Sequence, residues 1–91
     1  MSAKKKTENE AALKNALNIL KQVSESSSTP RNIRKTLKEV TDMLTDTSTG
    51  IGIRAANAIS MLDDISQDPN MPSFARVTIW SGVSELENIR E

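Results

Sequence analysis

A repeat constrains this chain more than any other feature, because the sequence matches itself when it is shifted by 42 positions. Pro30 then falls on Pro72, and Arg34 falls on Arg76, without a gap. The other identities are Asn15 with Asn57, Ala16 with Ala58, Leu20 with Leu62, Ser24 with Ser66, Thr36 with Thr78 and Leu44 with Leu86. A proline opens many helices at their first turn, so the pattern predicts two copies of a helical hairpin whose second helix begins at the proline.

Within each hairpin, apolar residues recur at the spacing of an amphipathic helix. We expect the first helix to begin near Thr7, where Thr7 and Glu10 fit a capping box, and to end in the serine-rich run 24–28. Thr29 is the expected N-cap of the second helix, with Pro30 at its first helical position. The expected ranges of the last three helices are 30–44, 51 or 53 to 66, and 72–89.

Four helices joined by short loops predict an all-α fold, an antiparallel four-helix bundle made of two pseudo-repeated hairpins. The 91 residues suffice for one domain, which we place at 7–91 behind a disordered basic N-terminus at 1–6. Two hairpins are fewer than the three repeats that a solenoid needs, so we expect them to close on each other.

Composition argues against an enzyme. The chain contains neither Cys nor His, which removes thiolate chemistry, the commonest general base and the commonest metal ligand. No hydroxyl has a base to activate it. Gly50 and Gly52 precede a helix, but the strand and the Lys-Ser/Thr pair of a phosphate loop are missing, so we interpret this segment as a helix-entry turn. We expect no catalytic, cofactor or metal site.

No apolar run approaches the roughly 20 residues that cross a bilayer, and no signal-peptide core follows the basic start. We therefore expect a cytoplasmic protein without a membrane partner.

Two resemblances appear along the chain. The segments that begin at Pro30 and Pro72, each with an arginine four residues on, look like the second helix of HEAT-type repeats, whose period is about 40–47 residues. The run from Gly52 to Trp80, together with residues 30–34, resembles a small archaeal family, the uncharacterised protein family numbered 0147. This second resemblance covers nearly the whole chain after the basic start. It implies an all-helical fold and an archaeal cytoplasm, and it implies no activity, cofactor or catalytic residue.

Charge is unevenly distributed, although the net charge is zero. Residues 1–45 carry nine Lys or Arg against five Asp or Glu, and residues 46–91 carry three against seven. A candidate phosphate-contacting basic face consists of Arg31, Arg34, Lys35 and Lys38. Such a face could bind nucleic acid, although Phe74 and Trp80 are the only aromatic residues available for base stacking. The alternative is that the two halves neutralise each other within the fold.

Trp80 is the candidate anchor for a protein partner or a second copy, together with Val77 and Met71. The repeat places Trp80 opposite Lys38, which predicts a position beside the core rather than in it. Glycine costs about 1 kcal/mol relative to alanine in a helix interior, so Gly82 predicts close packing. The structural alternative is that the Trp80 ring folds over Gly82.

Asp63, Asp64 and Asp68 are the densest carboxylates, and at the end of the third helix they oppose its dipole. Our structural interpretation is compensation by Arg34 or Arg76. The alternatives are a partner's basic surface and a Mg²⁺ ion held by Asp64 and Asp68.

The leading functional hypothesis is a non-enzymatic helical protein-interaction module, a small scaffold or adaptor that binds a protein partner or itself. The alternative is an RNA- or ribosome-associated accessory protein that uses its basic N-terminal half.

Overall fold

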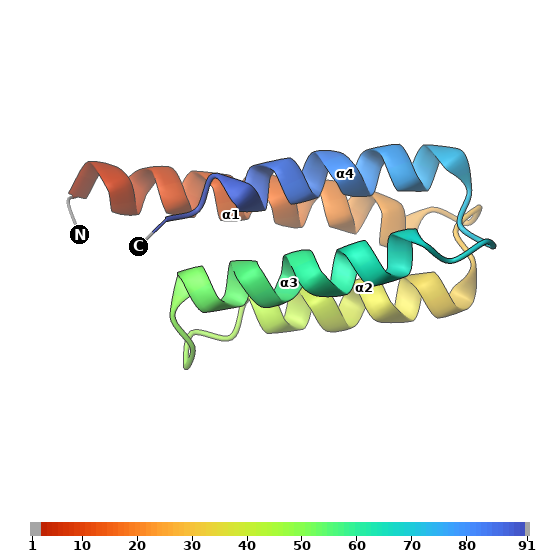
Figure 1. Cartoon of the computed structure of the whole chain (residues 1–91), viewed down its shortest axis with the longest axis horizontal. Helices are drawn as coiled ribbons and strands as arrows, with labels where there is room; N and C mark the ends of the chain where they lie inside the picture. Colours follow the sequence, from red (N-terminus) through yellow and green to blue (C-terminus); the bar gives the residue numbers. More distant parts are fainter. Residues whose placement is uncertain (1–2, 91) are drawn as a thin grey trace.

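The computed structural model describes residues 3–90, with side chains from residue 5 onward, and contains four helices and no strand within that range (Figure 1). The helices are α1 (Ala3–Glu25), α2 (Arg31–Leu44), α3 (Ile51–Ser66) and α4 (Ser73–Glu87). α1 with α2 forms one antiparallel hairpin and α3 with α4 forms the other. The predicted all-α bundle of two repeated hairpins is confirmed.

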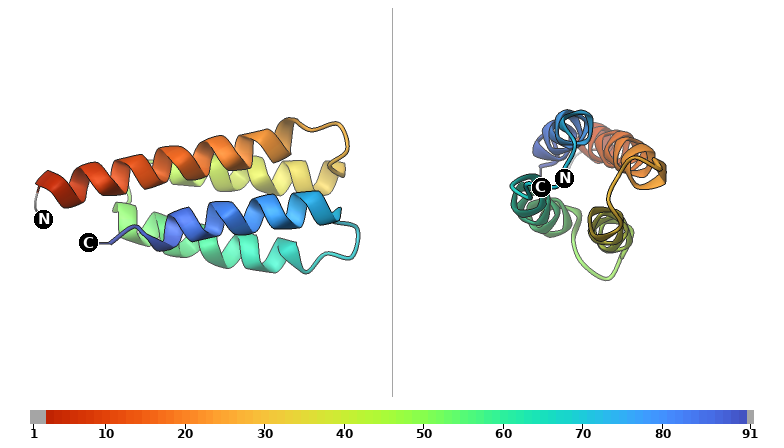
Figure 2. Two further views of the ribbon diagram at one scale, coloured as in Figure 1. Left: turned by 90° about the horizontal axis from the view of Figure 1, so that it is seen from above. Right: turned by 90° about the vertical axis from the view of Figure 1, so that its right-hand side faces the viewer.

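The hairpins pack so that α2 and α4 lie at opposite corners of the bundle (Figure 2). α1 contacts both α2 and α4, and α3 also contacts both. The two hairpin turns lie at one end of the bundle, whereas the α2–α3 loop and the two ends of the described chain lie at the other. The outer faces of α2 and α4 therefore point to opposite sides of the molecule.

The core is a repeat of one buried pattern. α2 buries Ile33, Leu37, Val40 and Leu44. α4 buries the residues 42 positions later, Ala75, Ile79, Gly82 and Leu86, and adds Val83. α1 and α3 contribute aliphatic residues such as Leu20 and Leu62, which are also equivalent by the repeat. Apolar burial of this kind is the main favourable term in folding. The two hairpins share the positions of their buried residues more than the residue types, since Ile33, Leu37 and Val40 correspond to Ala75, Ile79 and Gly82.

The prolines lie one position outside the places expected from the sequence. Pro30 and Pro72 are N-caps, and their carbonyls accept the first helical hydrogen bonds, from the amides of Arg34 (3.0 Å) and Arg76 (3.1 Å). The N-cap role expected for Thr29 is wrong. Thr29 is buried in the turn, where its hydroxyl donates to the Val23 carbonyl near the end of α1 (2.8 Å).

The first helix begins at Ala3 rather than Thr7, so the disorder expected for residues 3–6 and the capping box at Thr7 are wrong. Alanine and lysine have high helix propensity, which accounts for the extension. The rest of the expected N-terminal segment, residues 1–2, lies outside the described residues.

α4 ends at Glu87, two residues before the expected end at Ile89. Buried Asn9 of α1 then holds the chain after α4, because its side-chain oxygen accepts from the Arg90 amide (3.0 Å) and its nitrogen donates to the Arg90 carbonyl (2.5 Å).

Candidate functional site

The basic face predicted from the sequence forms one surface of α2. Arg31, Arg34, Lys35 and Lys38 follow the spacing i, i+3, i+4, i+7, which places them on one side of a helix, and all four are exposed. Together with Ser24 and Thr41 they line a shallow hollow of about 570 Å³ between α1 and α2. The structure therefore brings the four predicted residues together.

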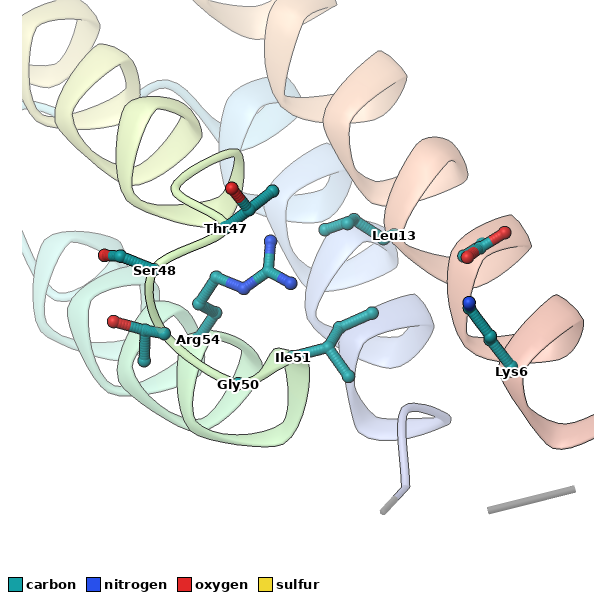
Figure 3. A pocket seen from close by; sticks show the side chains of 9 residues that line it. Lys6, Leu13, Thr47, Ser48, Gly50, Ile51 and Arg54 are labelled. Carbon is teal, nitrogen blue, oxygen red and sulfur yellow. The ribbon is translucent and has the colours of Figure 1, made fainter.

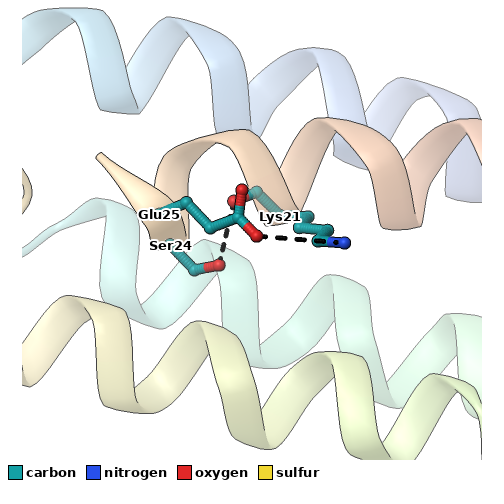
Figure 4. Close-up of polar contacts among 3 residues, drawn as sticks. All are labelled: Lys21, Ser24 and Glu25. Carbon is teal, nitrogen blue, oxygen red and sulfur yellow. Dashed lines mark hydrogen bonds and ion pairs between the residues drawn. The ribbon is translucent and has the colours of Figure 1, made fainter.

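None of these four cations forms an ion pair with any residue that the structure describes. The ion pair closest to them in sequence joins Lys21 to Glu25 on α1, at 3.8 Å between Nζ and Oε1, where the Ser24 hydroxyl also donates to the Lys21 carbonyl (Figure 4). The sequence left open that charges of the two halves of the chain neutralise each other. The four cations of the basic face take no part in such neutralisation within the described part of the chain.

Arg34 is exposed on α2, and at the end of α1 the Thr29 hydroxyl donates to the Val23 carbonyl. At the equivalent place in the second hairpin, Thr29 is replaced by Met71, which has no hydroxyl to donate. There Arg76, the equivalent of Arg34, donates from Nε to the Ser66 carbonyl (2.9 Å) and from Nη2 to the Asp68 carbonyl (3.3 Å). Free carbonyls at a helix end need such donors. Arg76 therefore stabilises the end of α3, whereas Arg34 has no equivalent contact among the described residues.

The second surface is an apolar row on the outer side of α4. Phe74, Val77 and Trp80 expose 45%, 59% and 52% of their area. Trp80 lies beside the core, as the repeat predicted. Sequence reasoning missed Phe74, although its spacing of three from Val77 is a signal that could have found it. Met71 is only 4% exposed and packs in the core, so its predicted part in a partner surface is wrong.

Gly82 permits close packing of helices, but not against the Trp80 ring. A Cβ added at Gly82 would come within 3.3 Å of Leu20 Cδ2 and 3.6 Å of Ile19 Cγ2, both on α1. The glycine therefore brings α4 close to α1, and the alternative in which Trp80 covers Gly82 is not what the structure contains.

The three carboxylates near the end of α3 do not form one cluster. Asp63 and Asp64 lie on α3, whereas Asp68 follows it in the turn, where its oxygens accept from the Asn32 side chain (3.0 Å) and the Asn70 amide (2.8 Å). No group of three or more acidic side chains in the described part of the chain could hold a metal ion. Of the two predicted compensating cations, Arg76 reaches the end of α3 and Arg34 does not.

A further hollow of about 490 Å³ lies between α1 and the α2–α3 loop, and Arg54 extends into it (Figure 3). Arg54 Nη1 donates to the Leu44 carbonyl at the end of α2 (2.7 Å). Sequence reasoning missed this contact, because it depends on how α3 lies against α2. Gly50 is the N-cap of α3, as expected for a helix-entry turn. Hydrogen bonds from the hydroxyl and the amide of Ser48 lower the pKa of the Asp46 carboxyl in the same loop.

No helix in the described range is both long and apolar enough to cross a bilayer.

Comparison with known proteins agrees with the resemblance noted in the sequence. A family model described as an uncharacterised protein family, UPF0147, matches residues 1–89. A UPF0147 protein of the archaeon Metallosphaera sedula is 49% identical over 84 residues, which cover 92% of this chain and 94% of the relative. A crystal structure from the same family, from Thermoplasma acidophilum, has a TM-score of 0.86 at 25% identity and covers 92% of this chain and 99% of its own. The crystal structure of a second protein, of unknown function, has a TM-score of 0.84 at 42% identity and covers 88% and 91%.

Proposed function

This chain belongs to the uncharacterised protein family UPF0147, and we propose that it is a non-enzymatic helical protein-interaction module, a small scaffold or adaptor of the archaeal cytoplasm. The proposal rests on one observation, the exposed apolar row of Phe74, Val77 and Trp80 on α4. About half of the area of each of these three large apolar residues remains in water, and exposed apolar groups gathered on one surface mark binding sites. Tryptophan is also the residue type most enriched among the residues that dominate binding energy.

The geometry of the row suits a protein partner. Phe74, Val77 and Trp80 are three residues apart, so they span about 9 Å along the helix. A ridge of this length fits the groove of a second helix or hydrophobic cleft. We take a different protein as the occupant, and self-association as the outcome that the test must separate from it.

The test compares Trp80→Ala with Ile53→Ala, because Ile53 is an equally exposed apolar residue on α3 (57%). Tagged wild-type protein and both variants are used to capture partners from an archaeal lysate, and each is also run by size-exclusion chromatography with light scattering. We expect a captured protein to be lost with Trp80→Ala and retained with Ile53→Ala, while melting stays unchanged. Equal capture by all three proteins contradicts the proposal, as does a large melting loss with intact capture.

Trp80 also reports on its own surface, since the chain has one Trp and no Tyr. The emission of the purified protein should be that of an indole about half exposed to water, and it should shift to shorter wavelength when the partner is added. A shift that appears on concentrating the protein alone indicates a second copy as the occupant.

A second candidate function is that of an accessory protein that binds RNA or the ribosome through the basic face of α2. The observation that favours it is the set of four exposed cations without an ion pair in the described structure. Capture with and without nuclease tests this function. Partners that vanish with nuclease support it, and partners that all survive nuclease contradict it.

A further inference from the structure

We propose that the basic face of α2 binds the phosphate backbone of double-stranded nucleic acid; this inference rests on the second candidate function and names its ligand. The basic face is Arg31, Arg34, Lys35 and Lys38, with Ser24 and Thr41 completing the hollow that they line.

The charges of the face oppose one another in the free protein. Arg31 and Lys35 are four residues apart on α2, as are Arg34 and Lys38, and like charges at this spacing destabilise a helix. No described carboxylate pairs with any of the four. A row of phosphates would relieve both repulsions at once, because each phosphate can lie between neighbouring cations.

The direction of the charges along α2 also opposes the helix dipole. Arg31 and Arg34 lie at its N-terminal end, where anions are favoured, and the first turn contains no acidic residue. Glu39 and Asp42 lie towards its C-terminal end, where cations are favoured. An anion bound at the face would interact favourably with the four side chains and with the dipole together. Residues that lower local stability in this way are typically found at functional sites.

The hairpin fold does not require this charge. The repeat places Ser73, Arg76, Val77 and Trp80 of α4 at the positions equivalent to the four cations. Only Arg76 is charged, and its guanidinium is bound to carbonyls of the preceding helix and turn. The same face of the hairpin therefore carries four cations in one copy and one in the other, so the cations serve something other than folding.

The shape of the site favours a backbone over bases. The cations span seven residues, about 10 Å, along one wall of the hollow. A neighbouring hollow shares Ser24, Lys38 and Thr41 and continues along the boundary of α1 and α2. Neither hollow has an aromatic lining residue, whereas binding of single strands depends on bases stacking on aromatic rings. The exposed rings of the described chain, Phe74 and Trp80, lie on α4 at the opposite corner of the bundle. A duplex keeps its bases stacked and presents a dense row of phosphates, which is what this face can contact.

The experiment measures fluorescence anisotropy of the full chain with labelled duplex RNA, duplex DNA and single-stranded RNA, each of about 16 base pairs or nucleotides. Salt is varied between about 50 and 200 mM. If four phosphates are neutralised, the logarithmic salt slope is about −3.6, which is a loss of affinity of about 150-fold over this range. Lys35→Gln should reduce the slope by about 0.9. Lys14→Gln is the matched control, since Lys14 is exposed on α1 and does not line the hollow, and it should leave the slope unchanged.

A variant with all four cations replaced by glutamine should lose duplex binding and keep the helical circular dichroism and melting of the wild type. If the fourfold variant does not fold, the salt slope of the single variant Lys35→Gln still tests the proposal. Tight binding to both duplexes indicates backbone recognition, and a preference for duplex RNA over duplex DNA indicates a contribution from its shape and 2′-hydroxyls.

Three results overturn the proposal in different ways. Tighter binding to the single strand removes the duplex inference and leaves RNA association standing. No binding to any of the three probes at low salt removes both. An acidic protein that survives nuclease, and whose capture needs the four cations, assigns the face to a protein partner.

Discussion

Arg34 and Arg76 occupy equivalent positions of the repeat but differ in what they contact. Arg76 donates to carbonyls at the end of α3, whereas Arg34 is exposed on α2. The turn residue before each helix also differs, because the Thr29 hydroxyl donates to the Val23 carbonyl whereas its equivalent, Met71, is apolar and buried. The repeat alone therefore does not determine what an arginine at this position contacts.

Arg76→Gln should lower the free energy of unfolding by about 1–2 kcal/mol, since hydrogen bonds that involve a charged group contribute about that much or more. Arg34→Gln is the internal control, and it should stay within about 0.5 kcal/mol of the wild type, as exposed substitutions usually do. Urea denaturation of both variants checks the pair. Equal effects would show that Arg76 does not cap α3.

Asn9 is a residue whose role no sequence pattern could show, because its partner lies 81 positions away. Its amide binds both backbone groups of Arg90 from a buried position on α1. Asn9→Ala removes both hydrogen bonds to the backbone of Arg90, so we expect the free energy of unfolding to fall by about 1–3 kcal/mol. Hydrogen exchange of the Arg90 amide should rise in the variant. Unchanged protection at Arg90 would mean that the chain after α4 is held by Ile89 alone.

At the scale of the elements, the contact of α1 with α4 depends on Gly82. The space there is limited by the side chains of Leu20 and Ile19, so a larger side chain must displace them or push the two helices apart. Gly82→Val should cost about 1–3 kcal/mol as an overpacked contact. Ser81→Val introduces the same side chain at the next, exposed position of α4 and should be nearly neutral. Thermal unfolding separates the two, and equal melting temperatures would contradict the close approach.

α2 is the element in which stability and binding are expected to oppose each other. Arg31→Glu places an anion at the N-terminus of α2 and removes the repulsion with Lys35, so the variant should be more stable by about 0.3–1 kcal/mol at low salt. The same change should weaken duplex binding, because it puts a negative charge in the basic face. Denaturation and anisotropy on one preparation measure both effects. A variant that loses stability and keeps its affinity would contradict the assignment.

At the scale of the whole molecule, the repeat alone predicts the bundle, because it reproduces the buried positions of one hairpin in the other. Ile33, Leu37 and Val40 are buried in α2 as expected, and so are their equivalents in α4. Contacts that break the repeat could not be predicted in this way. The hydrogen bond of the Thr29 hydroxyl to the end of α1 and the contact of Arg54 with the end of α2 both depend on how the chain packs after it leaves a helix. The basic face was predictable in full, whereas the apolar row was predicted with Met71 wrongly included and Phe74 omitted.

The same repeat explains why the molecule carries two surfaces rather than one. Equivalent faces of α2 and α4 point to opposite sides of the bundle, and the first is cationic where the second is apolar. A ligand on one face leaves the other open, so the two sites should act independently, as distant substitutions usually do. An adaptor needs this arrangement, because it must hold both partners at once.

Independence can be measured with a double-mutant cycle. Lys35→Gln should weaken duplex binding and Trp80→Ala should weaken protein binding, and neither should alter the other affinity by more than about 0.5 kcal/mol. The double variant should show both losses and no additional one. With both ligands present, the wild-type protein should bring labelled duplex and labelled partner into one complex, and each single variant should weaken that complex. If Trp80→Ala also lowered duplex affinity, the two faces would form a single site, and the chain would be a binder of one partner rather than an adaptor between two.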